Sequence, residues 1–310
     1  MKFRTEVTVP PARFTIAHSD KVMMLGSCFV ENISEKMLSG NFQVDVNPFG
    51  IVYNPVSIAN GLYDLINNRT YTPKDLFLHQ GVYHSFAHHS RFSDVSETAA
   101  LEGINSRIKL SSGFLKEATV LIITFGTANT YHLLSSGEVV SNCHKLPAKQ
   151  FKEARLSVSQ IVEQWNVLIK EMQKHTPDGL RILFTVSPIR HWKDGVHENQ
   201  LNKATLLLAV DELIKANDNC SYFPSYEIMM DDLRDYRFYA EDMIHPSFQA
   251  VDYIWEKFSD AYFSTSTKGF IKEWEGIQKA LNHRPFNPDS EEHQAFLKET
   301  EKRKEVLSNK

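Results

Sequence analysis

Ser27 and the pair Asp242 and His245 are the residues whose types and spacing could carry out nucleophilic catalysis. Ser27 follows Gly26 where an apolar run gives way to a helical pattern. A hydroxyl there would face the carboxyl end of a sheet, and the helix N-terminus would favour negative charge. Asp242 lies three residues before His245, so its carboxylate could orient the imidazole as a general base. Serine is also a common N-cap and Asp-x-x-His pairs arise by chance, so neither feature is decisive alone.

Two glycines that follow predicted strands could help to bind an oxyanion. Gly50 ends the segment Asn47-Pro48-Phe49, and Gly126 begins the segment that ends at Asn129. A glycine lets a backbone N–H approach a reacting oxygen, and an asparagine side chain can donate a second hydrogen bond. Ordinary turn formation would explain both glycines equally well.

The elements that must position these residues alternate between strand and helix patterns. Short apolar or alternating runs predict strands at 22–25, 42–46, 118–125 and 181–186, with an edge strand at 222–223. Apolar residues at helical spacing predict helices near 29–37, 57–66, 153–175, 206–214 and 246–258. Strands joined through helices run parallel with right-handed crossovers, so we expect a doubly wound α/β fold.

The domain organisation expected is one α/β domain over residues 1–265 with a helical extension over 266–310. Residues 51–117 are less regular and are expected to form an insertion over the sheet. The extension carries amphipathic patterns at 270–281 and from Glu291 onward. A homodimer is expected only because dimers are the commonest oligomers.

Composition excludes several classes of protein. The chain has 310 residues, with 34 Lys and Arg against 38 Asp and Glu, a net charge of -4. This balance gives no attraction to nucleic acid or to an anionic membrane. The three cysteines are too few and odd in number for a disulfide framework, and neither a signal peptide nor a membrane-spanning run is recognisable. We therefore expect free thiols and a cytoplasmic location.

Other residues allow alternatives. His84 and His88 have the spacing of a helical metal pair within the histidine-rich stretch 79–89, although an active-site lid or plain surface is the simpler interpretation. His191, Asp194 and His197 could bind a metal, but their position after a central strand favours substrate contact. Cys28 is expected to pack inside the first helix.

The order of these motifs resembles that of the SGNH, or GDSL-like, hydrolase superfamily. Leu25-Gly26-Ser27-Cys28-Phe29-Val30 is similar to the motif that names the GSCFA family, with valine in place of the final alanine. Similarity extends over about residues 23–258 and includes four further segments: 47–50, 125–128, 142–145 and 187–191, together with the stretch 231–246.

The resemblance implies a three-layer, flavodoxin-like sandwich and a serine hydrolase. Ser27 would be the nucleophile, His245 its base and Asp242 the residue that fixes the imidazole. The N–H groups of Ser27 and Gly50 would form the oxyanion hole. Asn129 would complete it, with Asn142 as a rival because Gly126 and Asn129 are separated by two residues rather than one.

The substrate implied is a small acyl ester, such as an O-acetyl group on a carbohydrate, and no cofactor is expected. His144, Arg190 and His191 are candidate substrate contacts. The same residues could transfer the acyl group to another hydroxyl, or a protein of this fold could bind a ligand without turnover. The metal-dependent hydrolase based on His191 remains a further alternative.

Overall fold

The computed structural model describes residues 5–308, apart from the side chains of Asp194 and Ser308. Its centre is a parallel sheet of five strands, in the order β10-β9-β5-β1-β2. Their bounds are β1 Lys21–Gly26, β2 Gln43–Val46, β5 Val120–Phe125, β9 Arg181–Val186 and β10 Cys220–Phe223. Numbered by position in the chain, this is the order 2-1-3-4-5 of flavodoxin-like sheets, whose ligands bind where the winding reverses, between the first and third strands. In this chain those strands are β1 and β5.

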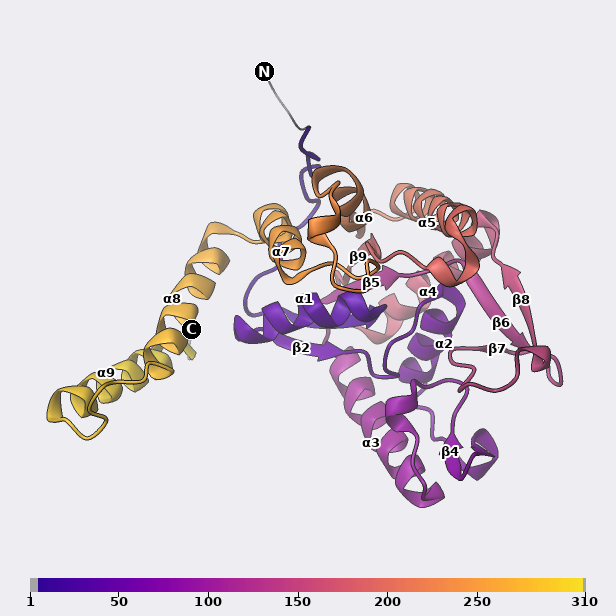
Figure 1. Cartoon of the computed structure of the whole chain (residues 1–310), viewed down its shortest axis with the longest axis horizontal. Helices are drawn as coiled ribbons and strands as arrows, with labels where there is room; N and C mark the ends of the chain where they lie inside the picture. Colours follow the sequence, from indigo (N-terminus) through magenta and orange to yellow (C-terminus); the bar gives the residue numbers. More distant parts are fainter. Residues whose placement is uncertain (1–4, 309–310) are drawn as a thin grey trace.

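Helices cover both faces of the sheet, because successive strand residues point to opposite sides. Met24 and Ile122 pack against α1 (Cys28–Ser39) and α7 (Phe248–Tyr262), which contact each other (Figure 1). Met23 and Ile123 pack on the other face, against four helices. These are α2 Pro55–Ile66, α3 Glu97–Leu115, α4 Val158–His175 and α5 Val196–Ala216. The three-layer α/β architecture and all five predicted strands are confirmed.

The segment 51–117 differs from the expected insertion. Its helices α2 and α3 pack on the sheet and belong to the main core, and α3 leads into β5 as an ordinary crossover helix. Only the middle stands apart, as the hairpin of β3 (Phe77–His79) and β4 (Val82–His84), with short 3-10 turns η1 (Pro73–Asp75) and η2 (Ser90–Phe92). The buried residues of α3 include Ser111 and Ser112 as well as apolar ones, so its helical pattern was weak in the sequence.

A second, antiparallel sheet follows β5 and was not predicted. It has the order β7-β6-β8, with β6 at Asn129–Leu133, β7 at Val139–Val140 and β8 at Phe151–Arg155. The helix predicted from 153 therefore begins only at Val158. Residues 151–155 pair with β6 instead, and Ser157 caps α4 in a reciprocal arrangement with Gln160.

The chain between β9 and α7 has several short elements. These are η4 Trp192–Asp194, α6 Ser225–Glu227, the π-helical turn η5 Ile228–Asp232 and η6 Tyr236–Phe238; η3, Ala148–Gln150, precedes β8. The C-terminal arm consists of α8 (Thr265–Leu281) and α9 (Glu291–Ser308), which extend away from the sheet (Figure 1). Trp274, Ile277 and Leu307 hold the two helices together. Within residues 5–308, no helix is both long enough and apolar enough to cross a membrane.

Candidate active site

The turn after β1 requires a glycine and presents the first candidate residues. Gly26 has a φ of +143°, and a Cβ on it would lie 2.2 Å from the carbonyl oxygen of Thr124 in β5. Ser27 follows as the N-cap residue of α1, yet its side chain caps no N–H. Ser27 is 1% exposed, and its Oγ has no hydrogen-bond partner among the described residues. The turn is therefore where the sequence predicted it, with the hydroxyl turned inward.

Asp242 and His245 form the oriented pair that their spacing predicted. Asp242 Oδ2 lies 2.5 Å from His245 Nδ1, while Oδ1 accepts the backbone N–H groups of Ile244 and His245, at 2.9 Å each. These N–H bonds, followed by the bond to the imidazole, lower the pKa of Asp242 to about 2. The carboxylate is thus charged at neutral pH and makes Nδ1 the protonated nitrogen, which leaves Nε2 as an acceptor.

Arg190 holds this loop in place. Its guanidinium donates to the carbonyl oxygen of Met243, a residue with a φ of +60° between Asp242 and His245. The guanidinium carbon also lies 4.3 Å from the ring centre of Tyr239. Arg190 was predicted to contact substrate; in the structure it supports the backbone of the loop that carries the candidate base.

The free side of His245 faces Cys28. His245 Nε2 lies 3.5 Å from Cys28 Sγ, whereas Ser27 Oγ has no described partner. Cys28 is partly exposed at the first position of α1. Cys28 was predicted to pack inside the helix, and the structure adds a contact that this prediction did not include, because the thiol reaches the imidazole of His245. The structure therefore assembles Asp242, His245 and Cys28 in one row.

Each predicted oxyanion donor makes an internal hydrogen bond. The Ser27 N–H donates to Thr124 O at 3.3 Å, and the Gly50 N–H donates to Asn47 O at 2.7 Å. The Asn129 side chain donates to Glu153 at 2.9 Å. An oxyanion would have to compete with these partners for each donor.

Asn142 and His144 belong to a different part of the molecule. Asn142 Oδ1 accepts the N–H of His144, whose Nε2 lies 2.8 Å from the carbonyl oxygen of Ser85. Burial lowers the pKa of His144 to about 4. Its ring packs 4.5 Å from that of His84 in the β3–β4 hairpin. His144 therefore joins two segments of the fold, and its contact with substrate stays a prediction.

Asn47 is a donor that the sequence analysis missed. Its Oδ1 accepts the N–H of Gly26 at 2.9 Å, directly before Ser27, and its backbone has a φ of +43°. Its Nδ2 is buried with no hydrogen-bond partner among the described residues. The side chain is therefore fixed beside the turn with one donor unused. Its place in the segment that ends at Gly50 was the available signal.

His191 and Lys203 lie beneath the same edge of the sheet. Lys203 is 1% exposed, and its Nζ donates to the carbonyl oxygens of Gly126 and Ser187, at 2.8 Å each. Burial lowers the pKa of Lys203 to about 7. Burial, and then the charges of Lys203 and His245, lower the pKa of His191 to about 4. His191 thus lies near enough to the candidate base for its charge to act on the ring, while contact with substrate stays a prediction.

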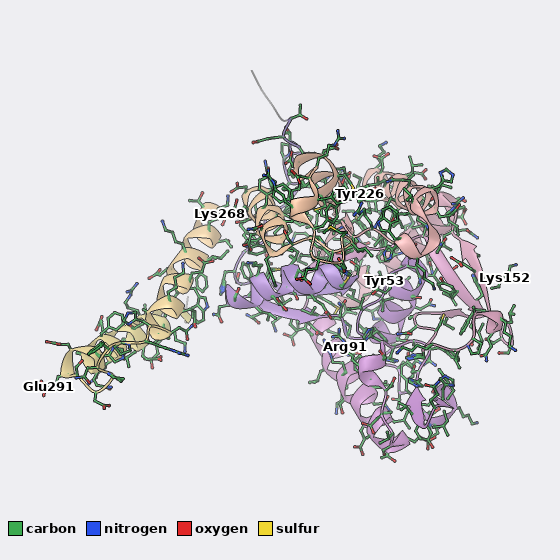
Figure 2. The ribbon with its side chains drawn as sticks, viewed as in Figure 1. Tyr53, Arg91, Lys152, Tyr226, Lys268 and Glu291 are labelled. Atoms are coloured by element: carbon green, nitrogen blue, oxygen red, sulfur yellow. The ribbon has the colours of Figure 1, made fainter. Side chains whose placement is uncertain are left out.

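Tyr53 adds an aromatic wall to this region. Its ring meets that of His191 edge-on, 5.5 Å between centres, and its carbonyl oxygen accepts the N–H groups of Gly126 and Thr127 (Tyr53 is labelled in Figure 2). Burial raises the pKa of Tyr53 to about 12, and Cys28 is the next contributor. Tyr53 thus lies close to Cys28. The sequence analysis did not single out Tyr53.

The two predicted metal alternatives lack support in the described residues. His84 lies in β4 and His88 in the turn after it, so their spacing is not helical. In residues 5–308 with described side chains, no group of three His, Cys, Asp or Glu residues could hold a metal ion. The Asp194 side chain of the second alternative lies outside the described part of the chain.

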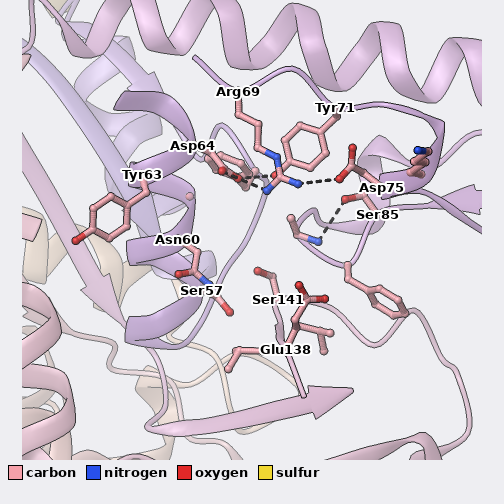
Figure 3. A pocket seen from close by; sticks show the side chains of 17 residues that line it. Ser57, Asn60, Tyr63, Asp64, Arg69, Tyr71, Asp75, Ser85, Glu138 and Ser141 are labelled. Atoms are coloured by element: carbon pink, nitrogen blue, oxygen red, sulfur yellow. Dashed lines mark hydrogen bonds and ion pairs between the residues drawn. The ribbon is translucent and has the colours of Figure 1, made fainter. Parts of the chain in front are cut away.

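A cavity of about 640 Å³ lies elsewhere, beside α2 and the hairpin (Figure 3). Arg69 forms ion pairs with Asp75 at 2.7 Å and Asp64 at 3.4 Å, and the Tyr71 hydroxyl donates to Asp64. Glu138 approaches from the opposite wall (Figure 3). None of the predicted catalytic residues lines this cavity, so its size does not make it the reactive site.

The fold and site define a doubly wound α/β protein with an oriented imidazole at the carboxyl edge of its parallel sheet. The model of the GSCFA family matches residues 21–258, and that of the GSCFA domain protein, C-terminal domain, matches residues 274–310. The chain therefore belongs to the GSCFA family. A search of curated proteins gave no significant match.

Proposed function

We propose that this protein is an acyl hydrolase that cleaves a small ester at the N-terminus of α1. The observation that carries the proposal is the Asp242–His245 pair, with Nδ1 held by the carboxylate and Nε2 directed at the Ser27–Cys28 turn. This is the arrangement by which a general base removes a proton from a nucleophile. Ser27 as the nucleophile stays a prediction of the resemblance.

The proposal places the family within the SGNH superfamily. The order of the strands, the glycine-serine turn after the first strand and the Asp-x-x-His pair before the last sheet-covering helix support this placement. The three cysteines are free, which agrees with the proposed cytoplasmic location. The proposed substrate is a small acyl ester or an acylated carbohydrate. Transfer to a second hydroxyl instead of water would use the same base.

Hydrolysis of p-nitrophenyl acetate by the purified protein tests the reaction class. We expect turnover in the wild type and its loss in His245→Ala, with Cys143→Ser as a matched control away from the pair. A fluorophosphonate adduct that maps to Ser27 and disappears in Ser27→Ala would establish the serine as nucleophile. Equal turnover in wild type and His245→Ala would defeat the proposed function.

A further inference from the structure

Cys28 occupies the place in the site that a nucleophile needs. It is the first residue of α1, partly exposed, and its Sγ lies 3.5 Å from His245 Nε2. Since Nδ1 of the same ring donates to Asp242, the thiol is the donor to Nε2. Carboxylate, imidazole and thiol therefore form a continuous row of hydrogen bonds, in which the thiol proton can pass to the imidazole and the carboxylate holds the ring.

Ser27 lacks each of these properties in the structure. The residue is 1% exposed, and its Oγ has no hydrogen-bond partner among the described residues. Its N–H is directed to Thr124, so the residue serves the junction of β1, β5 and α1. For Ser27 to attack a substrate, its side chain would have to turn outward and displace the thiol from His245.

The surroundings of Cys28 explain why this thiol needs a base. Burial raises the pKa of Cys28 to about 11, and the charge of Glu31 adds to this effect. The N–H groups of Cys28 and Phe29 act in the opposite direction, as does Lys203. The resting thiol is neutral at physiological pH, and an adjacent imidazole is the group that can take its proton during attack.

We propose that Cys28 is the nucleophile of this site and that the reaction proceeds through a thioester on its Sγ. The inference rests on the proposed function, because it uses the same base. His245 Nε2 takes the thiol proton while Sγ bonds to the ester carbonyl carbon. The carbon–oxygen bond to the alcohol then breaks, and the alcohol leaves with the proton from Nε2. Water next attacks the thioester carbon and gives one proton to Nε2; the carbon–sulfur bond then breaks, the proton on Nε2 returns to Sγ, and the acid leaves.

Alkylation by iodoacetamide tests the nucleophile without any assumption about the natural substrate. Peptide mapping follows Cys28 and Cys143 in one sample, so the second, half-exposed thiol is an internal control. We expect His245→Ala to slow alkylation of Cys28 by about tenfold and to leave Cys143 unchanged, because only Cys28 contacts the imidazole. An equal rate at Cys28 in wild type and His245→Ala would overturn the inference.

Trapping of the acyl group gives a second test. After a brief reaction with p-nitrophenyl acetate and acid quench, we expect an acetyl group on Cys28 that neutral hydroxylamine removes. Cys28→Ala should lack it, and Cys28→Ser should carry an oxygen ester that resists this treatment. Acetyl on Ser27 that persists in Cys28→Ala would overturn the inference while the proposed hydrolase stands. Turnover unaffected by His245→Ala would instead defeat the hydrolase itself.

Discussion

The histidine cluster around the β3–β4 hairpin and the single His245 of the candidate site differ in what surrounds each imidazole. His88 and His144 are buried among aromatic rings of the hairpin region, and burial lowers the pKa of His88 to about 3 and that of His144 to about 4. The His245 side chain is 46% exposed and lies between a carboxylate and a thiol. The comparison teaches that histidine count does not indicate chemistry. Chemistry is indicated instead by a carboxylate beside one ring nitrogen and a reactive group beside the other.

The largest expected effect is on the rate of ester hydrolysis, and it distinguishes His245 from the buried His88. His245→Ala should lower the rate of ester hydrolysis by about a thousandfold, within the range that a positioned base contributes. His88→Leu should keep the rate within about threefold, because His88 contacts Ser85, Phe49 and Tyr71 rather than the candidate base. Initial rates on p-nitrophenyl acetate measure both. A large loss in His88→Leu, with the fold intact by circular dichroism, would erase the distinction.

Asp242→Asn should have the next largest effect, about a hundredfold on the rate. An amide keeps the size of the carboxylate but places an N–H donor or a weaker acceptor beside Nδ1, so the imidazole loses its preferred tautomer. The residue is half exposed, so water replaces part of the interaction. Asp231→Asn is the matched control, because Asp231 pairs with Arg234 at the surface. Equal rates for the two variants would mean that Asp242 does not orient the base.

Local sequence patterns predicted the main sheet and the first helix, because each apolar run and each helical spacing lies within one short stretch of the chain. The run 22–25 became β1, and Phe29, Ile33 and Met37 lie on the buried face of α1. The strand at 151–155 was missed because its partner is β6, about twenty residues earlier, and the helix predicted from 153 overlapped its second half. Pairing over that distance leaves no local signal.

The site was predictable in its parts but not in its contacts. The spacing of Asp242 and His245 anticipated their hydrogen bonds, whereas the choice between Ser27 and its neighbour Cys28 depends on side-chain rotamers at one helix turn. Lys203 was missed although it shares a buried helix face with Leu206 and Val210. A lysine at that spacing was the available signal, and only the carbonyl groups that it meets explain its burial.

Substitution of Arg190 is expected to have a smaller effect on the rate of ester hydrolysis. It tests whether the loop that carries His245 depends on the hydrogen bond from Arg190, a support that differs from the burial of His88 and His144. Arg190→Gln should lower the rate by about tenfold, because it removes the bond to Met243 and loosens the loop. We expect the loss in kcat more than in KM if Arg190 positions the loop, and in KM if it binds substrate. Arg237→Gln, whose guanidinium is largely exposed, is the control. A loss confined to KM would instead support the substrate contact predicted from the sequence.

The smallest effect concerns stability in acid and tests the buried histidines. The pKa of His88 is about 3 in the folded protein against about 6.5 in an unfolded chain, so between these values the unfolded state binds more protons. The free energy of unfolding is therefore retained above pH 6.5 and falls as the pH is lowered. His88→Leu should reduce this slope by about 1 kcal/mol per pH unit between pH 6 and 4. Urea denaturation at pH 6, 5 and 4 measures it, with Ser136→Ala as an exposed control. An unchanged slope would mean that His88 gains its proton as readily when folded, and that its burial does not distinguish it from an exposed imidazole.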